Sequence, residues 1–146
     1  MPPSTSAPPS FGLALVRIGL GALCLWEAHQ IWLRGVGPWI VEDASYRIAA
    51  APDFYATFGQ EVVLRFPRAF AWLAFAITLA GGALLFVGAL VRPASAALIV
   101  LLVNAYFAGP PQRREYAVLL ALCALGCAAS KAGRRMGLDA WLDARL

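Results

Sequence analysis

The stretch AFAWLAFAITLAGGALLFVGALV, residues 69–91, decides the fold, because it is long and contains no charged side chain. A helix of about 20 mainly apolar residues crosses a membrane whose hydrocarbon core is about 30 Å thick. Lipid offers the backbone no hydrogen-bond partners, so a spanning segment of this kind must be helical. Pro67 suits the first turn of such a helix. We therefore expect a membrane-spanning helix over residues 67–91.

The overall composition is also that of a membrane protein. Of the 146 residues, 61% are hydrophobic and 14% are charged. Soluble domains are about 45–50% apolar and about 25% charged. Three further apolar stretches are expected to span the membrane, at residues 11–33, 93–108 and 115–131. The last two are short enough to be re-entrant or interfacial helices instead.

Tight breaks between the later stretches favour spanning hairpins. The breaks are Arg92-Pro93 and Gly109-Pro110-Pro111, and each would fold one helix back against its neighbour. The predicted fold class is therefore all-α, an integral membrane four-helix bundle. It forms a single transmembrane domain over residues 11–146, preceded by a disordered Pro/Ser-rich tail at residues 1–10.

The connection between the first two helices, residues 34–66, is long for a compact bundle. Connections of this length are usually functional or covered by partners. Residues 41–51 and 54–64 could form short amphipathic helices with their aromatic side chains at headgroup level. The alternative is an aromatic-rich lid that only shields the bundle.

Charge gives a weak indication of orientation and of partners. The net charge of +4 suits contact with anionic membrane lipid and gives no evidence for nucleic acid. An even number of spans places both termini on one side of the membrane. The basic cluster at Lys131, Arg134 and Arg135 lies next to a helix end, which favours cytoplasmic N- and C-termini.

The three cysteines all fall inside the expected spans. Cys123 and Cys127 lie four residues apart on one helix face, where they cannot form a disulfide, and Cys24 is on another helix. No Cys-x-x-Cys or histidine cluster accompanies them, so no metal site is predicted. We expect small buried residues at helix contacts, with a redox role as the alternative.

Polar residues in the first two spans are expected to mark packed faces. Arg17, Gly21, Cys24 and Ala28 share one stripe, and the small residues would let another helix approach closely. Arg17 is expected either to reach the near membrane surface or to pair inside the bundle. Thr78 is expected to hydrogen-bond to a carbonyl of its own helix.

One end of the predicted bundle collects polar side chains from several helices. Glu27, His29 and Gln30 end the first helix, Asn104 lies near the end of the third, and Glu115 begins the fourth. Such an end, with apolar helices beneath it, suits the headgroup of an amphipathic molecule such as a quinone. Glu27 is expected to face inward, and His29 outward. The alternative is that these are ordinary polar helix ends.

Three motifs together resemble the DoxX-like family of four-helix bacterial membrane proteins. The motif residues are, in order, Arg17 and Gly21; Gly82, Gly88, Arg92, Pro93 and Ala94; and Gly133, Gly137, Leu138 and Asp139. The family includes DoxD-type subunits of thiosulfate:quinone oxidoreductase. Of its motif residues, Arg17, Arg92 and Glu115 match here. Thr78 stands where members usually have a glutamate, and Glu27 and Gln30 stand where they often have glycine and lysine.

The resemblance implies a membrane subunit of a quinone-linked or thiol/sulfur redox complex in the bacterial inner membrane. Its partners would be membrane lipid and a protein, such as a soluble oxidoreductase. No flavin, haem or nucleotide motif is present, so any enzymatic activity would depend on partner chains. The alternatives are a non-catalytic anchor or assembly subunit, and a small-molecule carrier. The candidate catalytic residues are Glu27 and Glu115, and the candidate cofactor-binding residues are Arg17, Gln30, Arg92 and Asn104.

Overall fold

The computed structural model describes residues 11–36, 48, 51–109 and 111–129. Several sequence predictions lie outside these residues: the tail at residues 1–10, most of the expected helix at residues 41–51, the Gly133-to-Asp139 motif and the basic cluster around Arg134. The placement of both termini is therefore not described.

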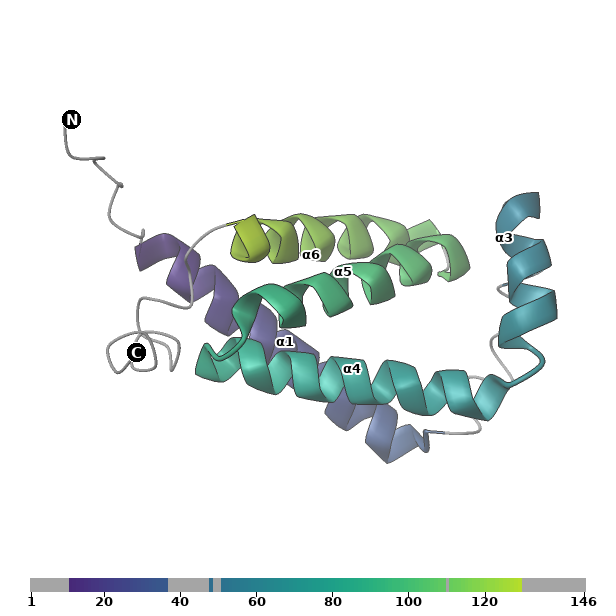
Figure 1. Ribbon diagram of the computed structural model, residues 1–146, viewed down its shortest axis with the longest axis horizontal. Coiled ribbons are helices and arrows are strands. Elements are labelled where there is room, and N and C mark those ends of the chain that lie inside the picture. Colours follow the sequence, from purple (N-terminus) through teal and green to yellow (C-terminus); the bar gives the residue numbers. More distant parts are fainter. Residues whose placement is uncertain (1–10, 37–47, 49–50, 110, 130–146) are drawn as a thin grey trace.

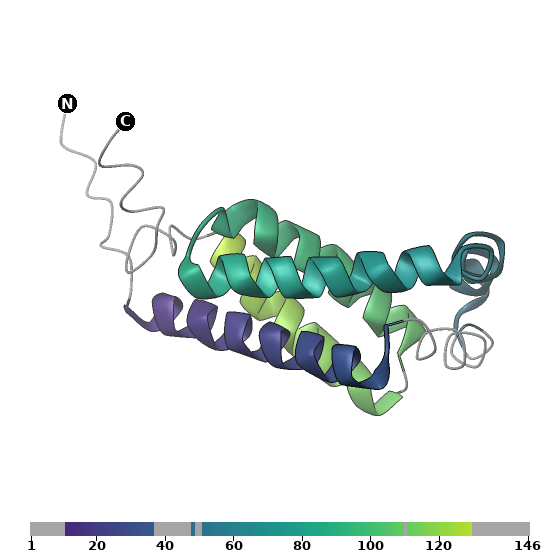
Figure 2. The same cartoon turned by 90° about the horizontal axis from the view of Figure 1, so that it is seen from below.

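Four long helices form the bundle: α1 (Phe11–Arg34), α4 (Pro67–Val87), α5 (Val91–Ala108) and α6 (Pro111–Ala129). They run alternately up and down, so that α1 begins and α6 ends at the same end of the bundle (Figures 1 and 2). The pairs α1–α4 and α5–α6 pack most extensively, and α4–α5 and α1–α6 contacts close the ring. The predicted all-α membrane bundle is confirmed.

A short helix lies in the long connection between α1 and α4. Helix α3 (Asp53–Phe58) continues directly into one π-helical turn (Gly59–Val63). It lies roughly perpendicular to the bundle axis at the end opposite the α4–α5 turn (Figures 1 and 2). The second predicted short helix, residues 54–64, is therefore present at nearly those positions.

The turn between α4 and α5 falls earlier than the sequence suggests. Gly88 adopts a left-handed conformation with φ 77° and donates its N–H to the Leu84 carbonyl at 2.9 Å, which ends α4 at Val87. Leu90 also has a positive φ of 49°, and α5 begins at Val91 with Pro93 in its first turn. The predicted span over residues 67–91 thus includes this turn.

Three helices in the described part of the chain are long and apolar enough to cross a membrane: α1, α4 and α5. Helix α6 is not among them, although the sequence predicts a fourth span there. Arg113, Arg114 and Glu115 occupy its first turns, so its uncharged part is short. It still packs along α5 and against α1 as a member of the bundle.

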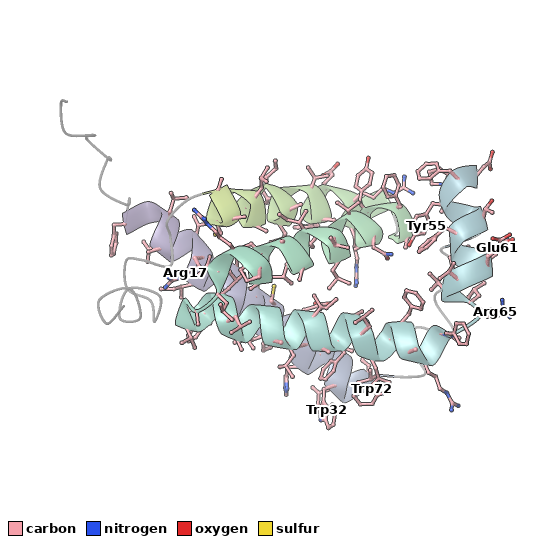
Figure 3. The ribbon with its side chains drawn as sticks, in the orientation of Figure 1. Arg17, Trp32, Tyr55, Glu61, Arg65 and Trp72 are labelled. Atoms are coloured by element: carbon pink, nitrogen blue, oxygen red, sulfur yellow. The ribbon has the colours of Figure 1, made fainter. Side chains whose placement is uncertain are left out.

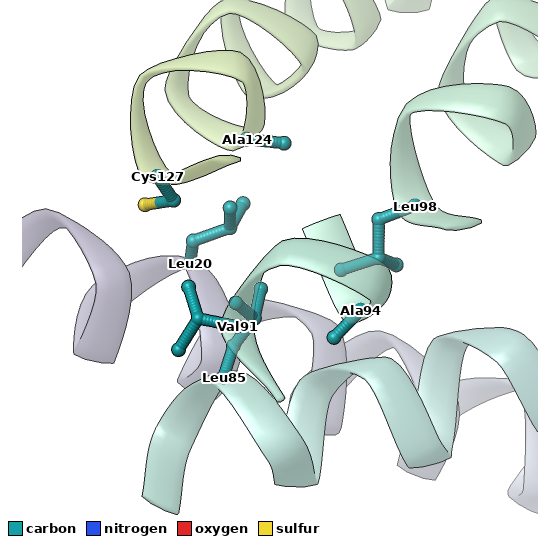
Figure 4. Close-up of a cluster of buried hydrophobic side chains, with 7 residues drawn as sticks. All are labelled: Leu20, Leu85, Val91, Ala94, Leu98, Ala124 and Cys127. Atoms are coloured by element: carbon teal, nitrogen blue, oxygen red, sulfur yellow. The ribbon is translucent and has the colours of Figure 1, made fainter. Parts of the chain in front are cut away.

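The buried core lies at the end of the bundle where α4 turns into α5. All four long helices contribute to it (Figure 4), through Leu20, Leu85, Val91, Ala94, Leu98, Ala124 and Cys127. A second cluster toward the α3 end contains only Ile31, Val36, Ala71 and the neighbouring Phe75 among the described residues, and these belong to α1, its continuation and α4. Toward α3 this second cluster joins only α1 and α4, because α5 and α6 add no described residue to it.

Helices α1 and α4 touch backbone to backbone at Gly21 and Gly82. A Cβ on Gly21 would lie 2.6 Å from the Phe86 amide nitrogen, and one on Gly82 would lie 2.9 Å from Cys24 Cβ. Arg17 and Ala28 on the same stripe are buried. The stripe predicted to be the packed face of α1 is confirmed.

Candidate functional site

Aromatic contacts hold α3 against the end of α5. Tyr55 points toward the bundle, whereas Glu61 points away from it (Figure 3). The Tyr55 ring stacks on Phe107 at a centroid distance of 5.7 Å, and Phe54 meets Phe107 edge-on at 5.2 Å. Tyr55 is only 7% exposed as a result. These contacts place one buried phenol over the end of the bundle that lies opposite the four-helix core.

A polar pair lies within these aromatic rings. The side chains of Tyr55 and Asn104 are hydrogen-bonded. Burial raises the pKa of Tyr55 above its ordinary value, and the hydrogen bond with Asn104 lowers it only in part. Tyr55 is therefore a neutral phenol at physiological pH, and both groups keep hydrogen-bonding capacity beyond the single bond they share.

Arg114 of α6 adds a cation beside the neighbouring Tyr106. Its guanidinium lies over the Tyr106 ring, 6.0 Å from the centroid, and Tyr106 meets Phe107 edge-on at 5.2 Å. The Nε atom of Arg114 is buried and has no hydrogen-bond partner within the described residues. We call this group the α3-end site; it comprises Tyr55, Asn104, Tyr106, Phe107 and Arg114.

The structure brings some of the predicted site residues to this end of the bundle. Asn104 and Gln30 are half-buried, while Glu27 and Glu115 are exposed. The prediction that Glu27 faces inward is wrong, because Ala28 and Ile31 occupy the buried face of α1 in that turn. His29 is exposed, as expected, and its ring lies 6.3 Å from that of Trp26.

Arg17 and Arg92 lie far from the α3-end site. Arg92 lies in the first turn of α5 and is exposed. Asn104 follows it by twelve residues in the same helix, which corresponds to about 18 Å. Arg17 lies at the same end as Arg92 (Figure 3) and is completely buried, so it does not reach for the membrane surface. Neither arginine can share a small ligand with Asn104.

Arg17 belongs instead to the end of the bundle that contains the four-helix core, which we call the closed end. Its charge acts electrostatically on the Cys127 thiol, which is part of the four-helix core. Cys24 and Cys123 pack against the same core, and all three cysteines are free thiols. The prediction of small buried residues at helix contacts is confirmed for Cys127, whereas Cys24 and Cys123 are only half-buried at such contacts. The described residues contain no group of three metal-ligating side chains.

Thr78 and Ser95 are buried hydroxyls near the middle of the bundle and the start of α5. Thr78 Oγ1 donates to the Ala74 carbonyl at 2.8 Å, as predicted. Ser95 Oγ has no hydrogen-bond partner within the described part of the chain. The hydroxyl donor of Thr78 is thus used by its own helix.

Comparison with known proteins places this architecture in a family. The family model DoxX matches residues 12–110, which is more than half of the chain. The chain belongs to the DoxX family. The matched segment of this DoxX protein includes Arg17, Arg92, Asn104 and Tyr55, whereas Glu115 and Arg114 lie beyond it. The comparisons with curated proteins and with solved structures found no match.

The part of this DoxX site that sequence reasoning missed is the pairing of Tyr55 with Asn104. The sequence places Tyr55 only in the headgroup layer, beside other aromatic residues of the connection. The spacing of Tyr55 and Gly59 could have indicated it. These two residues are one helical turn apart, and each is the buried residue of its segment. That spacing marks an inward face of the short helix, but it does not name the residue of α5 that this face meets.

Proposed function

We propose that this DoxX protein is the membrane subunit of a quinone-linked or thiol/sulfur redox complex, and that its α3-end site receives a quinone headgroup. The observation that carries the proposal is the pair of the buried Tyr55 and the half-buried Asn104, located at the end of the bundle opposite the four-helix core. An amphipathic molecule needs this combination: polar groups for its head, and apolar helix surface for its tail.

The residues present fit a quinone on chemical grounds. Quinone carbonyls accept hydrogen bonds, and the Tyr55 hydroxyl, the Asn104 amide and the Arg114 guanidinium are donors. The buried Arg114 Nε has no partner within the described residues, so a donor is available. Phe107 and Tyr106 supply flat apolar surface around these groups.

A bound quinone would supply the two-electron chemistry, taking up two electrons and two protons to become a quinol. The electrons would come from a thiol or reduced sulfur compound oxidised by a partner chain. Glu27 and Glu115 are the proposed proton-handling residues. Carboxylates can accept and donate protons, and neither of these side chains is enclosed by the bundle.

The test is binding of a short-chain quinone to the purified protein, measured by labelling with a photoreactive quinone analogue and competition by the unmodified quinone. Tyr55→Phe and Asn104→Leu are each expected to weaken binding about two- to tenfold, because each removes one hydrogen bond. Tyr116→Phe is the matched control, because Tyr116 is 68% exposed on α6. Labelling that is not saturable, or that survives both substitutions unchanged, would refute the site.

The second candidate function is a non-catalytic anchor or assembly subunit. One observation favours it: Asp53, Thr57 and Glu61 are exposed on α3 and its π-helical turn, and Glu61 points away from the bundle (Figure 3). Such a polar surface could dock a soluble partner. Glu61→Lys should then release co-purifying partner chains while quinone labelling of the bundle stays unchanged.

The carrier alternative has less support. Helices α1, α4 and α5 are each uninterrupted, whereas carrier sites are typically built from broken helices.

A further inference from the structure

Three arginines lie at the adjoining ends of α1 and α4. Arg34 ends α1, and Arg65 and Arg68 flank the start of α4; all three are exposed. The ends of these helices lie together, because Ile31 and Val36 pack against Ala71. Glu61 is one turn away from Arg65, yet no carboxylate in the described residues forms an ion pair with any of the three arginines.

Aromatic side chains lie next to the arginines on the same two helices. Trp32 of α1 stacks on Phe75 of α4 at 5.9 Å, and Trp72 meets Phe75 edge-on at 5.8 Å. Both tryptophans are more than half exposed and lie on the same side of the bundle (Figure 3). Exposed tryptophans on spanning helices are typical of the headgroup level of a membrane.

Arg65 points outward from this level. Its side chain extends away from the bundle (Figure 3), and its guanidinium lies over the Phe66 ring, 5.9 Å from the centroid. The apolar part of the edge is therefore aromatic, and the terminal turns of α1 and α4, with Arg65 just before α4, are cationic. A phospholipid in a membrane has the same order of groups, with its acyl chains toward the membrane interior and its phosphate at the surface.

We propose that this edge, which we call the α1–α4 edge, binds the headgroup of an anionic phospholipid. Arg34, Arg65 and Arg68 would contact the phosphate and any further anionic group, because guanidinium groups bind phosphate oxygens through paired hydrogen bonds. Trp32, Trp72 and Phe75 would pack beside the glycerol and upper acyl region. The inference does not depend on a quinone at the α3-end site, whose residues belong to α3, α5 and α6.

The charge of the headgroup determines which phospholipids this edge should prefer. A zwitterionic lipid has the same acyl chains and the same phosphate, but its ammonium group repels the arginines. A neighbouring cationic residue near an anionic headgroup typically contributes about fivefold to affinity. Two arginines removed together should therefore lower retention of the anionic lipid by about tenfold or more.

The experiment is native mass spectrometry of the full chain, released from detergent containing equal amounts of phosphatidylglycerol and phosphatidylcholine. The wild type is expected to retain phosphatidylglycerol preferentially, and the double variant Arg65→Gln with Arg68→Gln to lose that preference. Arg113→Gln is the matched control, because Arg113 is exposed at the same end of the bundle but on α6. It should keep the preference.

The proposal is overturned by equal retention of the two lipids, or by an equal loss in the Arg113→Gln control, since that would indicate only general attraction to positive charge. An acidic protein that co-purifies without any lipid preference would also overturn it. If the double variant does not insert, salt added to the wild type decides the question: the preference should fall as ionic strength rises, and a preference unaffected by salt refutes the role of the arginines.

Discussion

Substituting Gly21 by alanine should destabilise the bundle through one contact that the structure defines closely. The new Cβ would lie 2.6 Å from the Phe86 amide nitrogen, whereas ordinary contact begins at 3.4 Å. The obstructing atoms belong to the α4 backbone, so no side chain can rotate away. Helix α1 would have to move away from α4 by about 0.8 Å. Protein interiors are closely packed, so a shift of this size disturbs neighbouring contacts. Overpacking of this kind typically costs about 1–3 kcal/mol.

Gly19→Ala is the matched control for this prediction. Gly19 lies on the same helix, is exposed, and has nothing within 4 Å of the position that an added Cβ would take. Alanine is a better helix former than glycine by about 1 kcal/mol, and this gain applies to both variants. The difference between them therefore isolates the clash, and Gly21→Ala should be about 1–3 kcal/mol less stable than Gly19→Ala.

The assay is unfolding of the purified protein in mixed micelles with increasing dodecyl sulfate, followed by loss of helix content in circular dichroism. Equal midpoints for the two alanine variants would refute the close approach of α1 and α4 at Gly21.

Three other substitutions follow from single contacts. Tyr55→Phe should speed hydrogen exchange in α3, because it removes a buried hydrogen bond worth about 0.5–1.5 kcal/mol. The pKa of Tyr55 is raised in the folded protein. Its contribution to stability is therefore complete below the unfolded pKa of about 10, and it is lost as pH rises through the folded pKa. The stability of the wild type should fall in this range and that of Tyr55→Phe should not; identical dependence of stability on pH would contradict this. Ser95→Ala should leave the dodecyl sulfate midpoint unchanged or raise it, since the buried Ser95 Oγ has no partner within the described residues; a clear loss of stability would mean that the hydroxyl is bonded. Gly59→Ala should loosen α3, because its Cβ would lie 2.8 Å from Ile48 side-chain atoms; unchanged proteolysis of the segment would show that Ile48 can yield.

Much of the bundle could be predicted because the membrane leaves few alternatives. An apolar stretch as long as residues 69–91 must be a helix in lipid, and the small residues along the Arg17 stripe indicate where a second helix approaches. The limits of α4 could not be predicted as well, because the apolar run continues through Gly88 and Leu90, and only the backbone conformation ends the helix there. Helix α6 is harder still, since its charged first turns leave a short apolar segment.

The site could be predicted only in part, because side-chain direction depends on the partner helix. The helical angle of Glu27, near that of Cys24 and Ala28, predicts an inward position, but the crossing of α1 with α4 buries Ala28 and leaves Glu27 exposed. The sequence does mark Asn104 as a polar residue near a helix end. Its pairing with Tyr55 joins segments about 50 residues apart, and no local spacing rule specifies a contact between such distant segments.

The two ends of the bundle differ in how they are held together, and the proposed quinone site lies at only one of them. The closed end contains the four-helix core and the completely buried Arg17, and the α1–α4 backbone contact lies beside it. Burial of a cation is costly unless its surroundings compensate it, so substitutions there should act mainly on folding. The α3 end is held by a few aromatic contacts and one polar pair, so substitutions there should act on the attachment of α3 and on the proposed quinone site, and leave the four-helix core intact. A family that varies its partners or ligands could therefore change residues around α3 without rebuilding the bundle.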